Sequence, residues 1–120
     1  MSISIKNSTN VPIDGNGVWT GQVEDVTAWS AVGVGVLTDK DGEMGVQFST
    51  DGSHWDYTNT LSVSAGVASY KSCYVPAKNL RVKFENLDAS AQTFIRLQTS
   101  LKGSAQNMYQ AGSWDVTVLP

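Results

Sequence analysis

The sequence predicts an all-β fold, an antiparallel β-sandwich of about eight strands with a jelly-roll-like order. Ser, Thr and Val make up 38 of the 120 residues, a composition that suits half-buried strands better than helices. Apolar residues alternate with period two in several segments, and turn-forming runs of Gly, Asp, Asn and Pro separate these segments. Strands and turns at this spacing are typical of sandwiches and barrels.

The alternating segments define the expected strands in chain order. We expect strands at about residues 18–23, 28–38, 43–50, 55–60, 61–67, 69–75, 80–86, 92–101 and 114–119. Four sets of apolar side chains each share one face of a strand: Val32, Val34 and Val36; Met44, Val46 and Phe48; Leu80, Val82 and Phe84; Ile95 and Leu97. These sets are the predicted core.

The length fits a single domain that comprises residues 1–120. We expect residues 1–15, which are polar, to form an N-terminal arm or a frayed end. Residues 102–120 are expected to be either a C-terminal arm that packs on a neighbour or a last strand. No secretion signal and no apolar run of about 20 residues is present, which predicts a free-standing domain made in the host cytoplasm, without a membrane partner. The glycosylation sequon Asn7-Ser8-Thr9 is therefore expected to be a chance match.

The composition excludes several classes of chemistry. Cys73 is the only cysteine and His54 the only histidine, so disulfides within the chain and metal sites built from several cysteines or histidines are excluded. We expect no cofactor and no enzyme, because the chain has no G-x-S-x-G nucleophile motif and His54 lies on a tight turn where solvated residues are ordinary. The net charge of −3 also argues against nucleic acid as a partner.

Charge is unevenly distributed along the chain. Residues 1–60 carry 8 acidic and 2 basic residues, whereas residues 61–120 carry 3 acidic and 6 basic residues. Interleaved strands would mix these charges. If the halves stay apart, an acidic side and a basic side favour head-to-tail contact in a ring such as a trimer.

Two local patterns concern loops and strand faces. Asp39, Asp41 and Glu43 lack the spacing of a calcium-binding helix-loop-helix, so we expect a hairpin turn, with a weakly bound calcium ion as the alternative.

Gly33 and Gly35 alternate with valines inside a strand, which predicts the close approach of a neighbouring chain or sheet on the glycine face.

Trp55 and Tyr57 are spaced by two residues, so on one strand they would share a face. Two exposed aromatic rings on one face can form a platform for a pyranose ring. The alternative is that both rings pack in the core or at a sheet edge beside the turn.

Two sequence patterns resemble known families. The run Ser49-Thr50-Asp51-Gly52-Ser53-His54-Trp55 resembles the S-x-D-G-x-x-W hairpin of discoidin-like and carbohydrate-binding modules, in which Asp and Gly form the turn and Trp packs back. The wider pattern resembles small sandwich and jelly-roll proteins of tailed-phage particles. It comprises Trp19-Thr20-Gly21, Glu24-Asp25-Val26, Lys78-Asn79-Leu80-Arg81-Val82 and Phe94-Ile95-Arg96-Leu97-Gln98-Thr99.

The second resemblance implies a structural protein of a virion. We expect a capsid decoration (cement) protein on the capsid surface, with the major capsid protein and its own copies, as a trimer, for partners. The candidate interface residues are Arg81, Arg96, Tyr109 and Trp114; the arginines would pair across subunits with carboxylates such as Asp39 or Asp41. The alternative is a tail-fibre, baseplate or carbohydrate-binding module that recognises a receptor glycan through Trp55 and Tyr57.

Overall fold

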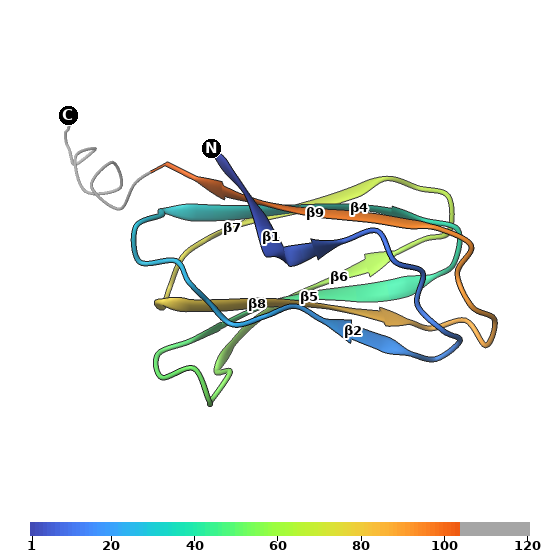
Figure 1. Ribbon diagram of the computed structural model, residues 1–120, viewed down its shortest axis with the longest axis horizontal. Coiled ribbons are helices and arrows are strands. Elements are labelled where there is room, and N and C mark those ends of the chain that lie inside the picture. The colour runs from blue at the N-terminus through green and yellow to red at the C-terminus, as the bar shows by residue number, and fades with distance from the viewer. Residues whose placement is uncertain (104–120) are drawn as a thin grey trace.

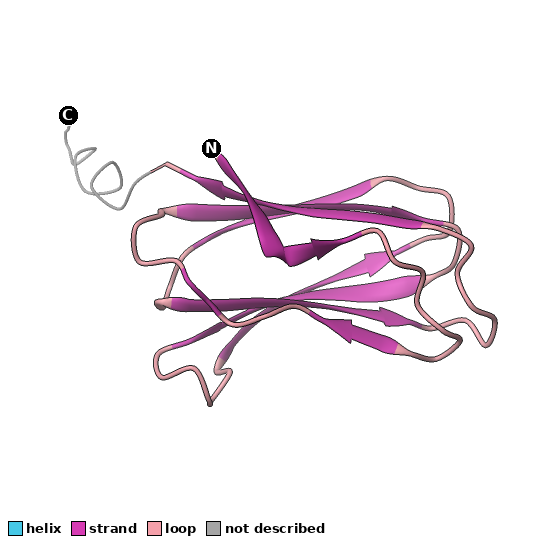
Figure 2. Cartoon of the chain, viewed as in Figure 1, coloured by secondary structure: helices cyan, strands magenta, loops and turns pink. Residues whose placement is uncertain are grey.

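A computed structural model, which describes residues 1–103, shows a two-layer β-sandwich (Figure 1). Its strands are β1 (Ser2–Thr9), β2 (Val18–Thr20), β3 (Glu24–Asp25), β4 (Ala31–Thr38), β5 (Gly42–Ser49), β6 (Tyr57–Val63), β7 (Ser69–Tyr74), β8 (Asn79–Asn86) and β9 (Ile95–Lys102). Figure 2 shows only strands and loops in this part of the chain. No helix with the length and hydropathy of a membrane span occurs among residues 1–103.

The strands form two antiparallel sheets. Sheet A has the order β1-β9-β4-β7, and sheet B has the order β2-β8-β5-β6, with β3 also paired to β8. When the two-residue strand β3 is set aside, the eight remaining strands can be numbered from 1 to 8 along the chain. In these numbers the order of sheet A is 1-8-3-6 and the order of sheet B is 2-7-4-5. This order is that of a jelly roll, so the predicted fold class is confirmed.

The core lies between the sheets and consists of the inward positions of alternating strands. All four predicted apolar sets are buried there, and none of their members is more than 4% exposed. Val26, Val63 and Leu101 extend this core, and Trp19 and Trp29 pack against it. The alternation of apolar and polar residues therefore identified the central strands correctly, because each has one face buried in the core and one face toward solvent.

The expectation of an arm over residues 1–15 is wrong for residues 2–9. These residues form β1, an edge strand of sheet A in which Ser2 lies opposite Leu101 of β9. The usual pattern is inverted in this strand, because Ser4 and Asn7 are buried whereas Ile3 and Ile5 are exposed. Hydrogen bonds, rather than apolar burial, hold the inward positions. The alternation of Ser2, Ile3, Ser4 and Ile5 is that of a strand, but its apolar side chains point outward, so it does not mark a core face. The burial of Asn7 also excludes glycosylation of the folded domain at this position.

Other predicted elements have different boundaries. The predicted strands 55–60 and 61–67 are one strand, β6. The predicted strand 18–23 is shortened to β2, and the two-residue strand β3, which was not predicted, follows it. The predicted strand 114–119 lies outside the described residues, as does the predicted C-terminal arm beyond Gly103.

The predicted hairpin turn at Asp39 and Asp41 instead connects the two sheets, because β4 belongs to sheet A and β5 to sheet B. Asp39 accepts hydrogen bonds from the backbone N–H of Thr93 at 3.0 Å and from its hydroxyl at 2.7 Å. Asp41 accepts one from the backbone N–H of Ala65 at 2.8 Å. These carboxylates therefore fix neighbouring loops. No group of three or more metal-ligating side chains is placed to hold an ion within residues 1–103.

The two sheets mix the acidic and basic halves of the chain. Sheet A combines β1 and β4 from the first half with β7 and β9 from the second, and sheet B combines β2 and β5 with β8. On the outer face of sheet B, Lys83 accordingly lies next to Glu85 and opposite β5. The two halves of the chain therefore do not form separate sides of the molecule. The sheets still differ in charge, because the strands of sheet A carry Lys and Arg but no carboxylate, whereas those of sheet B carry both signs.

Candidate functional site

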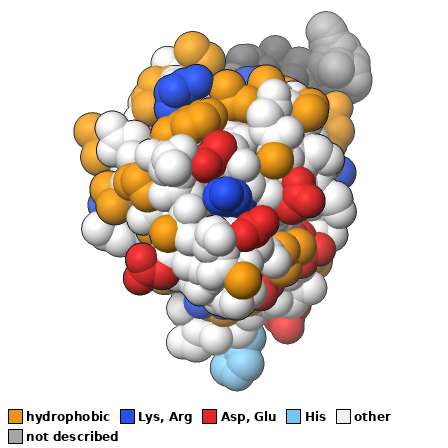
Figure 3. All heavy atoms as spheres, turned by 90° about the vertical axis from the view of Figure 1, so that its right-hand side faces the viewer, with side chains coloured by type: hydrophobic (Ala, Val, Ile, Leu, Met, Phe, Trp, Pro, Cys, Tyr) orange, Lys and Arg blue, Asp and Glu red, His pale blue; other side chains and the backbone are white. Residues whose placement is uncertain are grey.

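The outward faces of the two sheets have different chemistry. The outer face of sheet B carries polar and charged side chains: Glu43, Gln47, Thr58, Thr60, Lys83 and Glu85. The outer face of sheet A carries an apolar and aromatic set together with the uncharged polar residues Ser72, Gln98 and Ser100. The apolar and aromatic members are Ile3, Ile5, Leu37, Tyr70 and Tyr74. Figure 3, in which sheet A is uppermost, shows hydrophobic side chains gathered at the top and carboxylates mainly below them. An exposed apolar sheet face is unusual for a sandwich and marks an interaction surface.

A groove of about 900 Å³ runs over β9 and β4 on the outer face of sheet A. Ile3 and Ile5 of β1 form one wall, and Tyr70 of β7 forms part of the other. Gly35 lies in the floor, where an added Cβ would make only an ordinary contact of 3.7 Å with the Tyr70 ring. The floor is low because no side chain projects from it. On the outer face of sheet B, a smaller depression of about 140 Å³ lies around Gly45.

Tyr70 lies across the sheet rather than pointing away from it. A Cβ on Gly33 would collide with the Tyr70 hydroxyl, so the ring occupies the space that a side chain would take. The Lys102 ammonium donates a hydrogen bond to this hydroxyl and lies 4.9 Å from the ring centroid. The predicted close neighbour of Gly33 is thus Tyr70 of this same chain, whereas the space above Gly35 is open.

The charged groups of this face are cationic. Arg96 and Lys102 occupy outward positions of β9, and the Arg96 guanidinium lies 4.9 Å from the Phe94 ring centroid. The outward positions of β1, β9, β4 and β7 include no carboxylate within the described residues. An occupant of the groove with apolar side chains and a negative charge would therefore be complementary to it.

The predicted interface residues do not form one cluster. Arg81 lies on sheet B, where its Nε donates to Gln47 Oε1 at 2.6 Å, whereas Arg96 lies on sheet A. Tyr109 and Trp114 lie outside the described residues. Only Arg96 lines the groove, and the floor and walls were not identified from the sequence. The exposed apolar positions of β1 could have provided a signal, had residues 2–9 been recognised as a strand.

The predicted platform of Trp55 and Tyr57 on one strand face is not formed. Trp55 precedes β6 and packs against Arg81, whose guanidinium lies 4.3 Å from its ring centroid. Tyr57 lies opposite the buried Phe48 and therefore points to the inner face at the sheet edge. The loop before β6 is not in strand register, so the two-residue spacing does not place the rings together.

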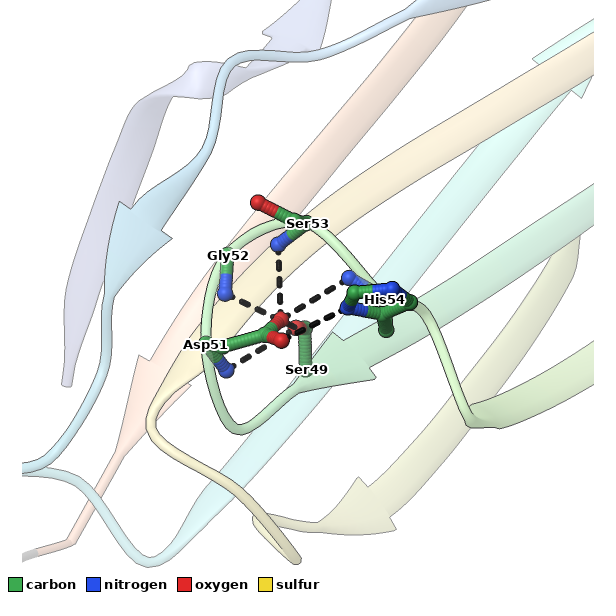
Figure 4. Close-up of polar contacts among 5 residues, drawn as sticks. All are labelled: Ser49, Asp51, Gly52, Ser53 and His54. Carbon is green, nitrogen blue, oxygen red and sulfur yellow. Dashed lines mark hydrogen bonds and ion pairs between the residues drawn. The ribbon is translucent and has the colours of Figure 1, made fainter.

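The loop between β5 and β6 is held by Asp51 (Figure 4). Its Oδ1 accepts hydrogen bonds from the backbone N–H groups of Ser53 and His54, each at 2.8 Å. Its Oδ2 lies 2.7 Å from His54 Nδ1, and Gly52 takes a φ of 80° that favours glycine. The His54 and Asp51 side chains are 76% and 50% exposed. The turn is structural, and His54 is the solvated turn residue that the sequence predicts.

The Asp51–His54 pair predicts a measurable titration. Hydrogen bonds from His54 and Ser53 hold the pKa of Asp51 well below its usual range, and the Asp51 carboxylate raises the pKa of His54 above 6.5. The pair's small stabilisation is therefore complete below about pH 6.5 and is lost as pH rises through the folded pKa of His54. On the acid side, the Asp51 contribution is lost as pH falls below about 4.

NMR titration of the imidazole signals measures this effect directly. We expect the pKa of His54 to lie above 6.5 in the native protein and to fall in the Asp51→Asn variant, because the amide carries no charge. Asp56→Asn is the control, since Asp56 is the weakest contributor to the shift. Equal pKa values in the native protein and the Asp51→Asn variant would contradict this assignment.

The two antiparallel sheets and their strand order define a jelly-roll β-sandwich protein. The chain belongs to the family described as "Uncharacterised protein YqxG N-terminal domain", whose model matches residues 1–102. No curated protein matches the sequence.

Solved structures share the fold at low sequence identity. The PBSX exported protein XepA has a TM-score of 0.76 and 21% identity, over 93% of this chain and 38% of the XepA chain. The Yersinia pseudotuberculosis-derived mitogen has a TM-score of 0.60 and 12% identity, over 86% of this chain and 88% of its own. The module TmCBM61, solved with β-1,4-galactotriose, has a TM-score of 0.52 and 15% identity, over 79% of this chain and 70% of its own.

This chain spans little more than a third of the XepA chain, and all three identities are low enough to show the fold alone. At this level, that of the sandwich fold, the resemblance expected from the sequence is confirmed by the PBSX exported protein XepA.

Proposed function

We propose that this chain is a non-enzymatic structural protein of a phage particle, a decoration (cement) protein that docks on coat subunits and on its own copies through the groove of sheet A. The observation that carries the proposal is the groove itself, an apolar and glycine-floored surface on a sandwich whose other outer face is polar. Contiguous exposed apolar surface of this kind supports a protein interface. The likeness to a PBSX protein supports the phage setting.

The mechanism is the burial of surface between neighbouring subunits. A stable contact buries on the order of 1,000 Å² or more, and a trimer that touches several coat subunits repeats this contact. Linked contacts must break together, so the shell gains resistance to internal pressure without any catalytic step. Arg96 and Lys102 add a preference for partners that carry carboxylates.

The copy number of the chain in purified particles from its source tests this proposal. We expect quantitative mass spectrometry to give hundreds of copies per particle, in a fixed ratio to the major coat protein. A few copies to a few dozen would contradict the decoration role and indicate a tail, fibre or baseplate component. Absence from the particles would overturn the virion role.

A second candidate function is recognition of a receptor glycan. The likeness to a module solved with β-1,4-galactotriose supports it, as does the Tyr70 ring, which is 54% exposed and lies near Gln98 and Arg96 in the groove. Binding to a glycan array that is lost in Tyr70→Ala and kept in Tyr57→Ala would favour this candidate. A blank array would count against it.

A further inference from the structure

Two copies of the groove cannot readily face each other. Such a pairing would bring Arg96 and Lys102 of both copies into one interface, with no carboxylate on the described part of either face to compensate. Like charges opposed across an interface are strongly unfavourable. Self-association through this groove therefore has to be heterologous, with a different part of the neighbouring copy as its occupant.

The groove defines the chemistry of that occupant. Its walls of Ile3, Ile5 and Tyr70 require apolar side chains, and its cations require a carboxylate without nearby Lys or Arg. The inward apolar positions of the described strands are already buried in the core. Residues 104–120 meet the requirement by sequence, because they contain one carboxylate and neither Lys nor Arg. Apolar residues stand at every second position at Trp114, Val116 and Val118, with Asp115 between them.

We propose that the groove receives residues 113–119 of a neighbouring copy, an inference that rests on the proposed structural role. As an extended strand, seven residues span about 23 Å, which matches the length of about 26 Å of the eight-residue strand β9 beneath the groove. Residues 104–112 provide up to about 30 Å of reach from Gly103 to another copy. In this pairing Trp114, Val116 and Val118 face the groove, and Trp114 fills the open space above Gly35. Asp115 projects from the other side of the strand and brings a negative charge to the cationic face without entering the groove.

Sedimentation velocity of the full chain tests this proposal with matched glycine variants. Gly35→Gln places a side chain in the floor of the groove, whereas Gly45→Gln places the same side chain on the outer face of sheet B. Both positions accept a Cβ without a close contact. We expect the native protein and Gly45→Gln to form the same oligomer. Gly35→Gln and Trp114→Ala are each expected to raise the dissociation constant of this oligomer by at least about tenfold, as the loss of a buried aromatic anchor does.

Charge reversal tests the ionic part of the contact. Arg96→Glu and Asp115→Arg are each expected to weaken the oligomer, and the double variant is expected to recover part of the loss because the opposite charges are restored. If the loss of binding free energy in the double variant equals the sum of the losses in the two single variants, the two side chains do not interact.

Three outcomes would overturn the inference. The first is a native chain that stays monomeric at high concentration, and the second is an oligomer that is insensitive to both Gly35→Gln and Trp114→Ala. The third is a monomer in which Gly35→Gln changes tryptophan fluorescence and Gly45→Gln does not, because residues 113–119 would then cover the groove of their own chain. Co-sedimentation with particles separates these results from the proposed function: a monomer that still binds particles leaves the decoration role intact.

Discussion

Replacement of Asn7 by alanine is expected to lower the free energy of unfolding by about 4 kcal/mol, since several buried polar groups lose their partners together. Asn7 is fully buried in β1, and its Oδ1 accepts a hydrogen bond from the backbone N–H of Val82 at 2.8 Å. Its Nδ2 donates to the Gln22 carbonyl at 3.0 Å and to Glu24 Oε1 at 3.1 Å. One side chain thus connects sheet A to sheet B.

Urea unfolding of the native protein and of Asn7→Ala at pH 7 measures this loss. An unchanged slope of the unfolding free energy against urea concentration would show that the two proteins unfold in the same way. Asn10→Ala is the control, because Asn10 is exposed and the same change there is expected to cost less than about 0.5 kcal/mol. A loss below about 1 kcal/mol in Asn7→Ala would mean that water replaces the amide and that Asn7 does not hold the sheets together.

Gly42→Ala is expected to destabilise the protein by about 3 kcal/mol, because the added methyl group has no space. A Cβ at this position would collide with the Phe84 ring and lie 2.6 Å from the backbone oxygen of Glu85. Both groups belong to β8, which pairs with β5, so relief would require the two central strands of sheet B to move apart. The buried ring and the strand pairing oppose that movement.

Gly45→Ala on the same strand is the matched control for this prediction. A Cβ on Gly45 meets no atom within 4 Å, so the change is expected to be neutral or to stabilise by up to about 1 kcal/mol. The effect of Gly→Ala on the unfolded chain is the same in both variants and cancels in their difference. Equal midpoints of thermal unfolding for the two variants would show that the Phe84 ring gives way at little cost.

The core could be predicted from the sequence because its residues follow the two-residue period of a strand with one buried face. Val32, Val34 and Val36 show this directly, and all three are buried. The turn at Asp51 and Gly52 could be predicted for a similarly local reason, since Asp accepts backbone hydrogen bonds there and Gly takes a positive φ.

The groove could not be predicted in this way, because it depends on pairing between distant segments. Ile3 and Ile5 become a wall only when β1 joins β9, and Gly35 becomes a floor only because Tyr70 turns toward Gly33. The platform of Trp55 and Tyr57 failed for the same reason: spacing along the chain has meaning only where both residues lie in one strand. The local signal for the groove is the alternation of Ile3 and Ile5 in β1. It does not identify a core strand, because these apolar side chains are exposed and the polar ones are buried.

The pairing of β1 with β9 also sets the order in which the domain can be completed. Ser2 lies opposite Leu101, so the first strand to leave the ribosome must wait for the last described one. At about 5–20 residues per second, synthesis of the intervening chain takes on the order of 5–20 s. During this time β1 is an unpaired strand, which is the condition that favours strand pairing between chains. Ile3 and Ile5 give this strand one apolar face during that time, whereas Ser4 and Asn7 make its other face polar. The side chains that later connect the two sheets thus deny the unpaired strand a second apolar face, and stacked copies of it could form a dry contact on one side only.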